Sequence, residues 1–361
     1  MAELLPPRPP SRHLLSVGDL ASDDVTRILE TARSLSGSLE REVKKLPTLR
    51  GRTVVNLFYE SSTRTLASFE LAAKRLSADT MSLRAAGSSV DKGESLKDTT
   101  LTLSAYDPDV IVVRHPAIGA AGLVARYTEA HVVNAGDGKH QHPTQALLDL
   151  YTMREALGQL DGLHVAIVGD VLHSRVARSL VQMLALVGAR ATLVGPPTLL
   201  PRGIEALGCE CSTDIGAIAD ADVVYVLRIQ RERMEQAFVP SLREYTALYG
   251  ITPERVRTGQ VVMHPGPMNR GVEIDPRVAD SEASLITDQV RSGLVVRMAV
   301  LYDLVVAERP VRISGQGVGV SGRSQGDPPA KRTSGVGLGA GSSPVTNPEV
   351  PPALTGPPRA D

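Results

Sequence analysis

Apolar residues along the chain occur in two patterns, short continuous runs and longer amphipathic stretches, and the two alternate. Continuous runs bounded by polar residues predict buried strands, and apolar residues at helical spacing predict amphipathic helices. The strands are expected at residues 53–59, 109–114, 131–134, 163–168, 190–194, 223–228 and 260–264. The helices are expected to begin near Asp24, Thr65, Ser95, Gly119, Pro143 and Ser174, with a last helix over residues 287–308. Strands that alternate with helices predict parallel sheets covered by helices on both faces.

Seven strands fit two sheets better than one, so the pattern predicts an α/β protein of two domains, each a parallel sheet flanked by helices. The long helix from Pro143 contains the expected boundary, near Glu155. We expect a flexible N-terminus at residues 1–12 and a first domain at residues 13–155, completed by the last helix at residues 287–308. A second domain should follow at residues 156–286, and a tail at residues 310–361.

The end of the chain differs in composition from the rest. Residues 311–361 hold ten of the 32 glycines, eight of the 25 prolines and no aromatic residue. Such a segment cannot bury enough apolar surface to offset the entropy lost on ordering. We therefore expect a disordered tail, which should be dispensable for folding and turnover.

The overall composition narrows the class of protein. Hydrophobic residues make up 42% of the chain, with no Trp and three Phe, which predicts aliphatic cores. The formal net charge is −1, from 39 basic and 40 acidic residues, and this balance argues against a nucleic-acid-binding surface. No apolar run approaches the roughly 20 residues of a membrane span. The first residues, MAELLPPRPPSRH, carry prolines where a signal peptide needs an apolar core.

The two cysteines, Cys209 and Cys211, are separated by one residue, too close for an ordinary disulfide. Two free thiols suit a reducing compartment, so we expect a cytoplasmic protein. As a metal-binding pair they lack partners nearby in the sequence, and we expect no metal site.

The stretch NLFYESSTRTLASFE joins the first strand to a helix through Ser62, Thr63, Arg64 and Thr65. Ligands of open α/β sheets bind at the carboxyl ends of strands, and the start of a helix attracts anions. Hydroxyl groups add donors there, and the planar guanidinium of Arg64 matches the geometry of a phosphate. Ser62 or Thr63 could instead only cap the helix. Four consecutive polar residues favour a phosphate site, and the Gly and Lys spacing of a P-loop is missing.

Three other strand ends carry groups that suit the same ligand. Arg114 follows the run in VIVVRHP, and His142 and Gln145 stand where a loop meets a helix in NAGDGKHQHPTQ. Gly266 and Pro267 follow the last strand in VVMHPGPMNRG. Because a histidine can donate to a carbonyl oxygen and a glutamine can bond an amide, these positions predict a phosphorylated substrate with a carbonyl group.

The motifs SSTRT, VVRHP, HPTQALLDL, LRIQRER and HPGP occur in that order, and the sequence resembles the aspartate carbamoyltransferase family over residues 12–308. The resemblance implies an enzyme of pyrimidine biosynthesis that converts carbamoyl phosphate and L-aspartate to N-carbamoyl-L-aspartate and phosphate. It implies no metal and no organic cofactor.

The resemblance also implies roles for individual residues. Four would hold the phosphate group: Ser62, Thr63, Arg64 and Thr65. Three would point at the carbonyl oxygen: Thr65, Arg114 and His142. The amide nitrogen would be bound by Gln145 and by the main-chain carbonyls of Gly266 and Pro267. The carboxylates of aspartate would be held by Arg175, Arg228 and Gln230.

The resemblance further implies a homotrimer with shared active sites. Lys92 would reach the site of a neighbouring subunit, with Ser88 or Ser89 beside it. Some relatives have a second lysine where Asp91 stands. Others read HPLP where this chain reads HPGP, so only the backbone roles carry over to Gly266 and Pro267. Regulatory chains or dihydroorotase are possible partners.

The chemistry accounts for these residue types. The aspartate amine attacks the carbonyl carbon, so negative charge develops on the carbonyl oxygen. Donors fixed around that oxygen stabilise the transition state more than the ground state. The leaving phosphate can accept the amine proton, so no nucleophile from the protein is required.

Three alternatives remain to be separated from this interpretation. Ornithine carbamoyltransferases typically have cysteine in their HPCQ and HCLP motifs, which read HPTQ and HPGP here. Arg175 and Arg228 also suit a dicarboxylate and not a cationic amino acid such as ornithine. A nicotinamide-dependent oxidoreductase would need three glycines after a strand, where Gly169 stands alone in VAIVGDVLHSR. A non-catalytic scaffold is disfavoured by the intact basic residues. Aspartate-dependent release of phosphate from carbamoyl phosphate would separate all three.

Overall fold

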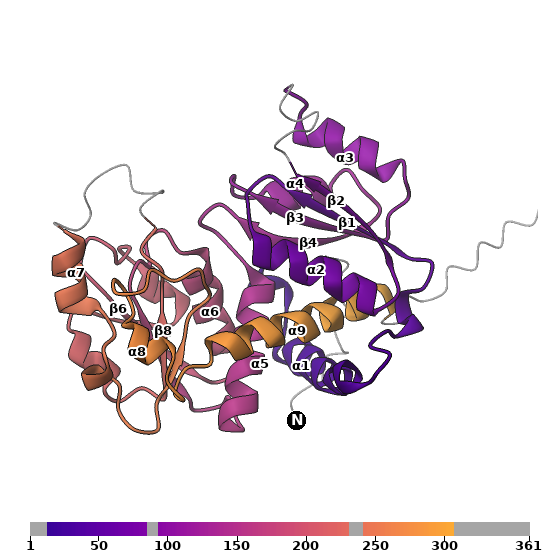
Figure 1. Ribbon diagram of the computed structural model, residues 1–361. Coiled ribbons are helices and arrows are strands. Elements are labelled where there is room, and N and C mark those ends of the chain that lie inside the picture. The colour runs from indigo at the N-terminus through magenta and orange to yellow at the C-terminus, as the bar shows by residue number, and fades with distance from the viewer. Residues whose placement is uncertain (1–12, 85–92, 231–240, 307–361) are drawn as a thin grey trace, which may run out of the picture. The chain divides into compact units, whose positions relative to one another are not determined.

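The computed structural model describes residues 13–84, 93–230 and 241–306, and it contains two parallel sheets with helices on their faces (Figure 1). One sheet has the strand order β2 (Asp79–Arg84), β1 (Thr53–Phe58), β3 (Val110–His115), β4 (His131–Asp137). The other has the order β7 (Glu210–Ser212), β6 (Arg190–Val194), β5 (His164–Val168), β8 (Val223–Val226), β9 (Val261–Met263). Every strand pair within the two sheets is parallel, so the predicted fold class is confirmed.

Helices precede, connect and follow these strands. In chain order they are α1 (Ser22–Ser36), α2 (Thr63–Arg75), α3 (Leu96–Ser104), α4 (Ala120–Ala125), α5 (Pro143–Leu157), α6 (Arg175–Leu186), α7 (Leu242–Tyr249), α8 (Pro276–Ala279) and α9 (Ile286–Val306). The long α9 packs against α1, α2 and α5, which precede it by more than a hundred residues.

The first sheet is covered on both faces. Val54 and Phe58 of β1 belong to one core cluster, together with residues of α2 and α9. Val55 and Leu57 belong to another, together with residues of α3 and α4. Because side chains alternate across a strand, a sheet covered on both faces needs apolar residues at consecutive positions. This is why the strand appears in the sequence as a continuous apolar run.

The second sheet follows the same rule. Val165 and Ile167 of β5 lie in the large cluster that also contains Val54 and Phe58 of the first sheet. Alternate residues of β5 face a separate cluster. The large cluster therefore continues from one sheet to the other, through buried residues of α5, α6 and α9.

Local signals fix the ends of the predicted helices. Ser62, Ser95 and Ser174 precede α2, α3 and α6, and each accepts a hydrogen bond from a backbone N–H of the first turn. Pro143 occupies the first turn of α5, and Gly158, with φ of 84°, ends that helix in the left-handed conformation that favours glycine.

Four elements were not predicted from the hydrophobic pattern. Strand β2 lies at the edge of its sheet and has no buried residue, so it forms no apolar run. Strand β7 has three residues and α8 has four, too few for a periodic signal. Helix α7 is preceded by Ser241, whose hydroxyl accepts from the backbone N–H of Glu244 at 3.1 Å. The Ser-x-x-Glu pattern of a capping box marks that helix start in the sequence.

The expected N-terminal segment and tail, residues 1–12 and 310–361, lie outside the described residues. Within the described ranges, no helix combines the length and the apolar character needed to cross a membrane. Cys209 and Cys211 are free thiols, as predicted.

Candidate active site

The predicted phosphate-binding residues lie at the start of α2, directly after the carboxyl end of β1. Ser62 precedes the first helical residue in an extended conformation, and its Oγ accepts a hydrogen bond from the Thr65 N–H at 3.4 Å. Thr63 and Arg64 are exposed, whereas Thr65 is buried. Ser62 therefore caps the helix, and the exposed Thr63 and Arg64 lie beside the positive end of its dipole.

The turn after β9 lies against Arg64. Gly266 has φ of 63°, and a Cβ atom placed on it would lie 2.8 Å from Cζ of Arg64. The peptide bond between Gly266 and Pro267 is cis. The structure thus brings two of the predicted site segments into contact, although more than 200 residues separate them in the sequence.

Arg114 and Arg175 meet over the backbone of Gly136. Arg114 comes from the end of β3, and Arg175 is the first residue of α6. A Cβ atom on Gly136 would lie 3.0 Å from Nη1 of Arg175 and 3.1 Å from Nη1 of Arg114. The φ of Gly136 is 119°, a value that side-chain-bearing residues rarely adopt. Only glycine leaves room for both guanidinium groups at this point.

Glu60 holds these two arginines together, and sequence reasoning did not identify it. Its Oε1 accepts from Nη2 of Arg114 at 2.8 Å and from Nη2 of Arg175. Nη1 of Arg114 also donates to the carbonyl oxygen of Ala135 at 3.1 Å. The side chains of Arg114 and Arg175 are 12% and 6% exposed, so both guanidinium groups are held in fixed positions in a largely dry environment.

His142 lies at the start of α5 and is buried. Its backbone N–H donates to Oγ of Ser179 at 2.8 Å, which ties this turn to α6, the helix that begins with Arg175. Burial, and then the positive charges of Arg114, Arg297 and Arg175, hold the pKa of His142 well below its ordinary value. Its Nδ1 has no hydrogen-bond partner among residues 13–84, 93–230 and 241–306. The imidazole is therefore neutral, with one buried nitrogen left for a ligand.

Gln145 lies one turn further along α5. Its Nε2 donates to Oδ1 of Asp149 at 3.0 Å, so the amide oxygen is directed away from that carboxylate. The side chain is 8% exposed.

Arg228 and Gln230 follow β8 in the second sheet, and both are partly buried. The Gln230 N–H donates to Oδ2 of Asp170, and its Nε2 donates to the carbonyl oxygen of His173, both at 3.2 Å. Oδ1 of Asp170 lies 2.8 Å from Nδ1 of His173. Asp170 and His173 thus tie the segment after β8 to the loop that leads into Arg175.

Lys92 lies outside the described residues, as do Ser88, Ser89 and Asp91. Among the described residues, no group of three or more His, Cys, Asp or Glu side chains could hold a metal ion.

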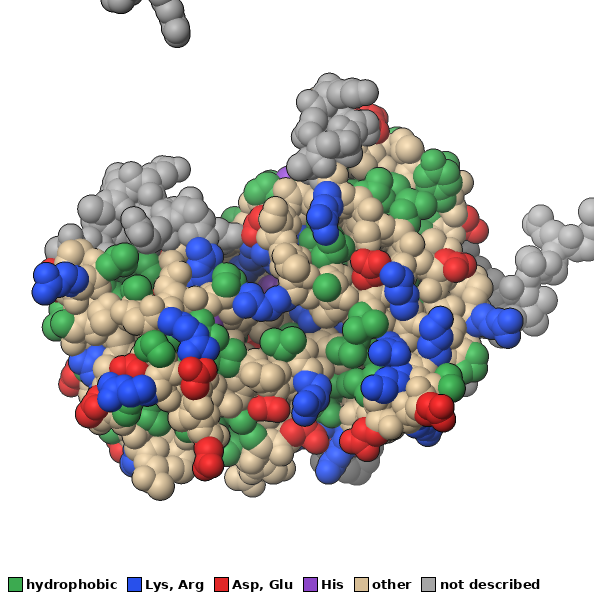
Figure 2. All heavy atoms as spheres, in the orientation of Figure 1, with side chains coloured by type: hydrophobic (Ala, Val, Ile, Leu, Met, Phe, Trp, Pro, Cys, Tyr) green, Lys and Arg blue, Asp and Glu red, His purple; other side chains and the backbone are tan. Residues whose placement is uncertain are grey.

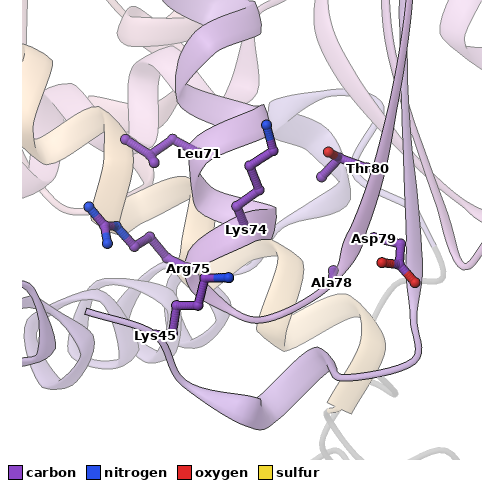
Figure 3. A pocket seen from close by; sticks show the side chains of 7 residues that line it. All are labelled: Lys45, Leu71, Lys74, Arg75, Ala78, Asp79 and Thr80. Carbon is purple, nitrogen blue, oxygen red and sulfur yellow. The ribbon is translucent and has the colours of Figure 1, made fainter. Parts of the chain in front are cut away.

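Basic side chains gather around a hollow in the face shown in Figure 2. A separate pocket, of about 560 Å³, is lined by Lys45, Leu71, Lys74, Arg75, Ala78, Asp79 and Thr80 (Figure 3). It lies at the C-terminal end of α2, a helix of 13 residues and hence about 20 Å long. This pocket is therefore remote from Arg64, and its basic residues complement the negative end of the helix dipole.

Comparison with known proteins gives matches over most of the chain. The family model "Aspartate/ornithine carbamoyltransferase, carbamoyl-P binding domain" matches residues 12–155, and "Aspartate/ornithine carbamoyltransferase, Asp/Orn binding domain" matches residues 161–304. The aspartate carbamoyltransferase catalytic subunit of Acidothermus cellulolyticus is 57% identical over 303 residues, which cover 83% of this chain and 94% of the relative. That of Thermobifida fusca is 58% identical over 298 residues, or 81% of this chain and 95% of the relative.

Solved structures are similar as well. Aspartate transcarbamoylase from Trypanosoma cruzi in complex with carbamoyl phosphate and aspartate has a TM-score of 0.74 and 30% identity, covering 80% of this chain and 95% of that chain. The same enzyme in complex with N-(phosphonacetyl)-L-aspartic acid has a TM-score of 0.75 and 30% identity, covering 80% of this chain and 94% of that chain.

Proposed function

This chain belongs to the aspartate/ornithine carbamoyltransferase family, and we propose that the cluster around Arg64, Arg114, His142 and Arg175 is its active site. The chain transfers the carbamoyl group of carbamoyl phosphate to the amine of L-aspartate, as its catalytic-subunit relatives do. The products are N-carbamoyl-L-aspartate, a precursor in pyrimidine biosynthesis, and phosphate.

The observation that carries the site proposal is the meeting of Arg114 and Arg175 over Gly136, with a neutral His142 nearby. Two fixed cations and a neutral imidazole suit a reaction in which an anionic substrate develops further negative charge. Glu60 is part of this arrangement because it holds the ends of both arginines.

Ser62, Thr63, Arg64 and Thr65 would bind the phosphate group of carbamoyl phosphate. The Ser62 oxygen already accepts from the Thr65 N–H, which leaves its own hydroxyl hydrogen available to an anion. Arg64 is exposed at the positive end of the helix, where a planar guanidinium can bond two phosphate oxygens.

Thr65, Arg114 and His142 would face the carbonyl oxygen and act as the catalytic residues. As the amine attacks the carbonyl carbon, charge moves onto that oxygen, and fixed donors stabilise it without reorganising. A neutral His142 can donate one N–H while it stays uncharged throughout. The departing phosphate takes the amine proton, so the protein needs no base of its own. Because the amine attacks the carbonyl carbon directly, no covalent carbamoyl-enzyme is formed.

The amino group of the carbamoyl moiety would bond the side-chain oxygen of Gln145 and the main-chain carbonyls of Gly266 and Pro267. Gln145 donates its own nitrogen to Asp149, which leaves its oxygen to accept. The contact of Gly266 with Arg64 supports a substrate that spans the two segments.

Arg175, Arg228 and Gln230 would hold the two carboxylates of aspartate. Arg228 and Gln230 lie just after β8, and Arg175 begins α6, the helix that follows β5 in the second sheet. We accordingly propose that residues 13–155, completed by the last helix, bind carbamoyl phosphate and that residues 156–286 bind aspartate.

We also propose that the protein is a homotrimer whose sites are shared, with Lys92 supplied by a neighbouring chain. Regulatory chains or dihydroorotase are possible further partners, and the cytoplasm is the proposed location. Sedimentation of the purified chain, alone and in lysate, tests the assembly.

Activity is tested by phosphate release from carbamoyl phosphate with aspartate, and ornithine serves as the control amine. Subunit complementation then tests site sharing. Chains carrying Arg64→Ala and chains carrying Lys92→Ala should each be nearly inactive, and activity should return when they exchange subunits. Activity that stays flat after verified exchange would contradict the shared site and the role of Lys92.

A further inference from the structure

Asp149 is a fully buried carboxylate one helical turn beyond Gln145 on α5. Its Oδ1 accepts from Nε2 of Gln145 at 3.0 Å and from Nε2 of Gln289 at 2.8 Å. Its Oδ2 accepts from the hydroxyl of Tyr225 at 2.7 Å. These donors come from α5, α9 and β8, so three elements that are distant in sequence meet at one carboxylate.

The arrangement is organised around a negative charge. An isolated ionised carboxylate is very costly to bury, whereas three donors and a nearby cation offset that cost. Arg297 of α9, itself 4% exposed, supplies the cation. Burial raises the pKa of Asp149 to about 7, against the opposing effect of the three hydrogen bonds and Arg297.

An ionised carboxylate can only accept hydrogen bonds, so both glutamines must turn their NH₂ groups toward Asp149. The oxygen of the Gln145 amide is then directed away from the carboxylate. The oxygen of Gln289 accepts the backbone N–H of His264 at 2.8 Å, and Nδ1 of His264 accepts the N–H of Gly266 at 2.8 Å. One carboxylate thus fixes a side-chain oxygen directly and a backbone turn through two further hydrogen bonds.

We infer that Asp149 is a positioning residue that sets the acceptors for the substrate's amino group. It orients the Gln145 oxygen directly. Through the hydrogen bonds of Gln289 and His264 it also fixes the backbone turn that carries the carbonyl groups of Gly266 and Pro267. Asp149 itself touches no substrate. The inference rests on the proposed roles of Gln145, Gly266 and Pro267, and it adds the group that enforces preference for NH₂ at that subsite.

Two stable ligands isolate this subsite. Phosphonoacetamide carries the phosphonate, carbonyl and NH₂ groups, and 2-oxopropylphosphonate carries a methyl group in place of NH₂. The ratio of their dissociation constants, measured by calorimetry at about pH 8.5, where Asp149 is ionised, reports recognition of the NH₂ group alone. The wild-type protein should prefer phosphonoacetamide by about 10²-fold or more, because a site built to bond an N–H group rejects the analogue that lacks it.

Asp149→Ala should reduce this preference at least about tenfold, because both glutamine amides become free to rotate. Gln289→Leu should give a smaller loss, since it releases the turn and leaves the bond between Asp149 and Gln145 intact. Thr152→Val is the matched control, because Thr152 is buried on the same helix. Among the described residues its hydroxyl bonds only the carbonyl oxygen of Leu148, at 2.7 Å. This control should keep the wild-type preference even if it lowers the melting temperature.

The outcomes separate the inference from the function on which it rests. A wild-type protein without preference for phosphonoacetamide would refute the roles of Gln145, Gly266 and Pro267 themselves. A wild-type preference that persists in folded Asp149→Ala, or equal weakening of both ligands, would overturn the positioning role. Should Asp149→Ala fail to fold, Gln289→Leu decides: a reduced preference supports the inference and an unchanged preference refutes it.

Discussion

A single methyl group placed on Gly136 should disturb both substrates at once. In Gly136→Ala the new Cβ would lie 3.0 Å from Nη1 of Arg175, 3.2 Å from Cζ of Arg175 and 3.1 Å from Nη1 of Arg114. These separations are shorter than ordinary van der Waals contact, so both guanidinium groups must move by a few tenths of an ångström. Glu60 bonds both arginines and limits how far each can retreat.

Two costs follow from this geometry. The φ of 119° at position 136 is unfavourable for alanine, and such strain typically costs about 1–3 kcal/mol of stability. Displacement of the arginines adds a loss of activity, because misplacement of groups near the reacting atoms by about 1 Å can lower rates roughly 10²-fold. We therefore expect kcat/KM to fall about 10- to 100-fold for carbamoyl phosphate and for aspartate alike.

Gly122→Ala provides the matched control. Gly122 lies in α4, has open space around the added Cβ and does not require a positive φ. Alanine should leave kcat/KM unchanged and slightly stabilise the helix. Steady-state kinetics with each substrate varied, together with thermal unfolding, measure both variants. If Gly136→Ala loses stability but keeps wild-type kcat/KM for both substrates, the two arginines are not positioned by their packing over Gly136, and the reasoning fails.

Three further predictions concern single side chains. Arg228→Ala should raise the aspartate KM by roughly 10- to 150-fold, since a charge-assisted hydrogen bond is worth about 1.5–3 kcal/mol. If calorimetry shows that carbamoyl phosphate binding is weakened as much as aspartate binding, the role of Arg228 in holding aspartate is contradicted. His142→Ala should lower turnover about 10²–10³-fold, and no carbamoylated His142 should be trapped in the native enzyme. NMR of the native enzyme should show a neutral His142 ring at pH 6.5, because the pKa of His142 lies well below its ordinary value. A ring that titrates near pH 6.5 would contradict the buried, positively charged surroundings of His142. Burial raises the pKa of Cys211 to about 12, so less of its thiolate is present at pH 8. Iodoacetamide should therefore modify Cys211 more slowly than it modifies free cysteine. Modification at the rate of free cysteine would disprove the raised pKa.

The parts of the fold that local chemistry determines were predictable from the sequence. A strand covered on both faces needs consecutive apolar residues, so β1, β3 and β6 appear directly in the hydrophobic pattern. Strand β2 has polar residues and no buried position, because it lies at a sheet edge, and the same pattern cannot reveal it.

The candidate site divides in the same way. Ser62 and Arg64 could be identified because strand and helix meet beside them in the sequence. Glu60 could not, since its meaning depends on Arg114 and Arg175, which lie 54 and 115 positions further along the chain. Asp149 appears in the sequence as an acidic residue between Leu148 and Leu150, a position compatible with an exposed face. Only the packing of α5 against α9 and β8 shows that its donors are fixed and that it is buried.

The large apolar cluster shared by the two sheets has a consequence for how the molecule unfolds. Val54 of β1 and Val165 of β5 belong to one continuous core, joined through α5, α6 and α9. Loosening either sheet removes packing partners from the other, so amide hydrogens of β1 and β5 should exchange with solvent in a single cooperative event. Helix α9, which comes last in the chain, packs on α1 and α2, which come first. A ribosome would therefore have to release nearly the whole polypeptide before that core could close.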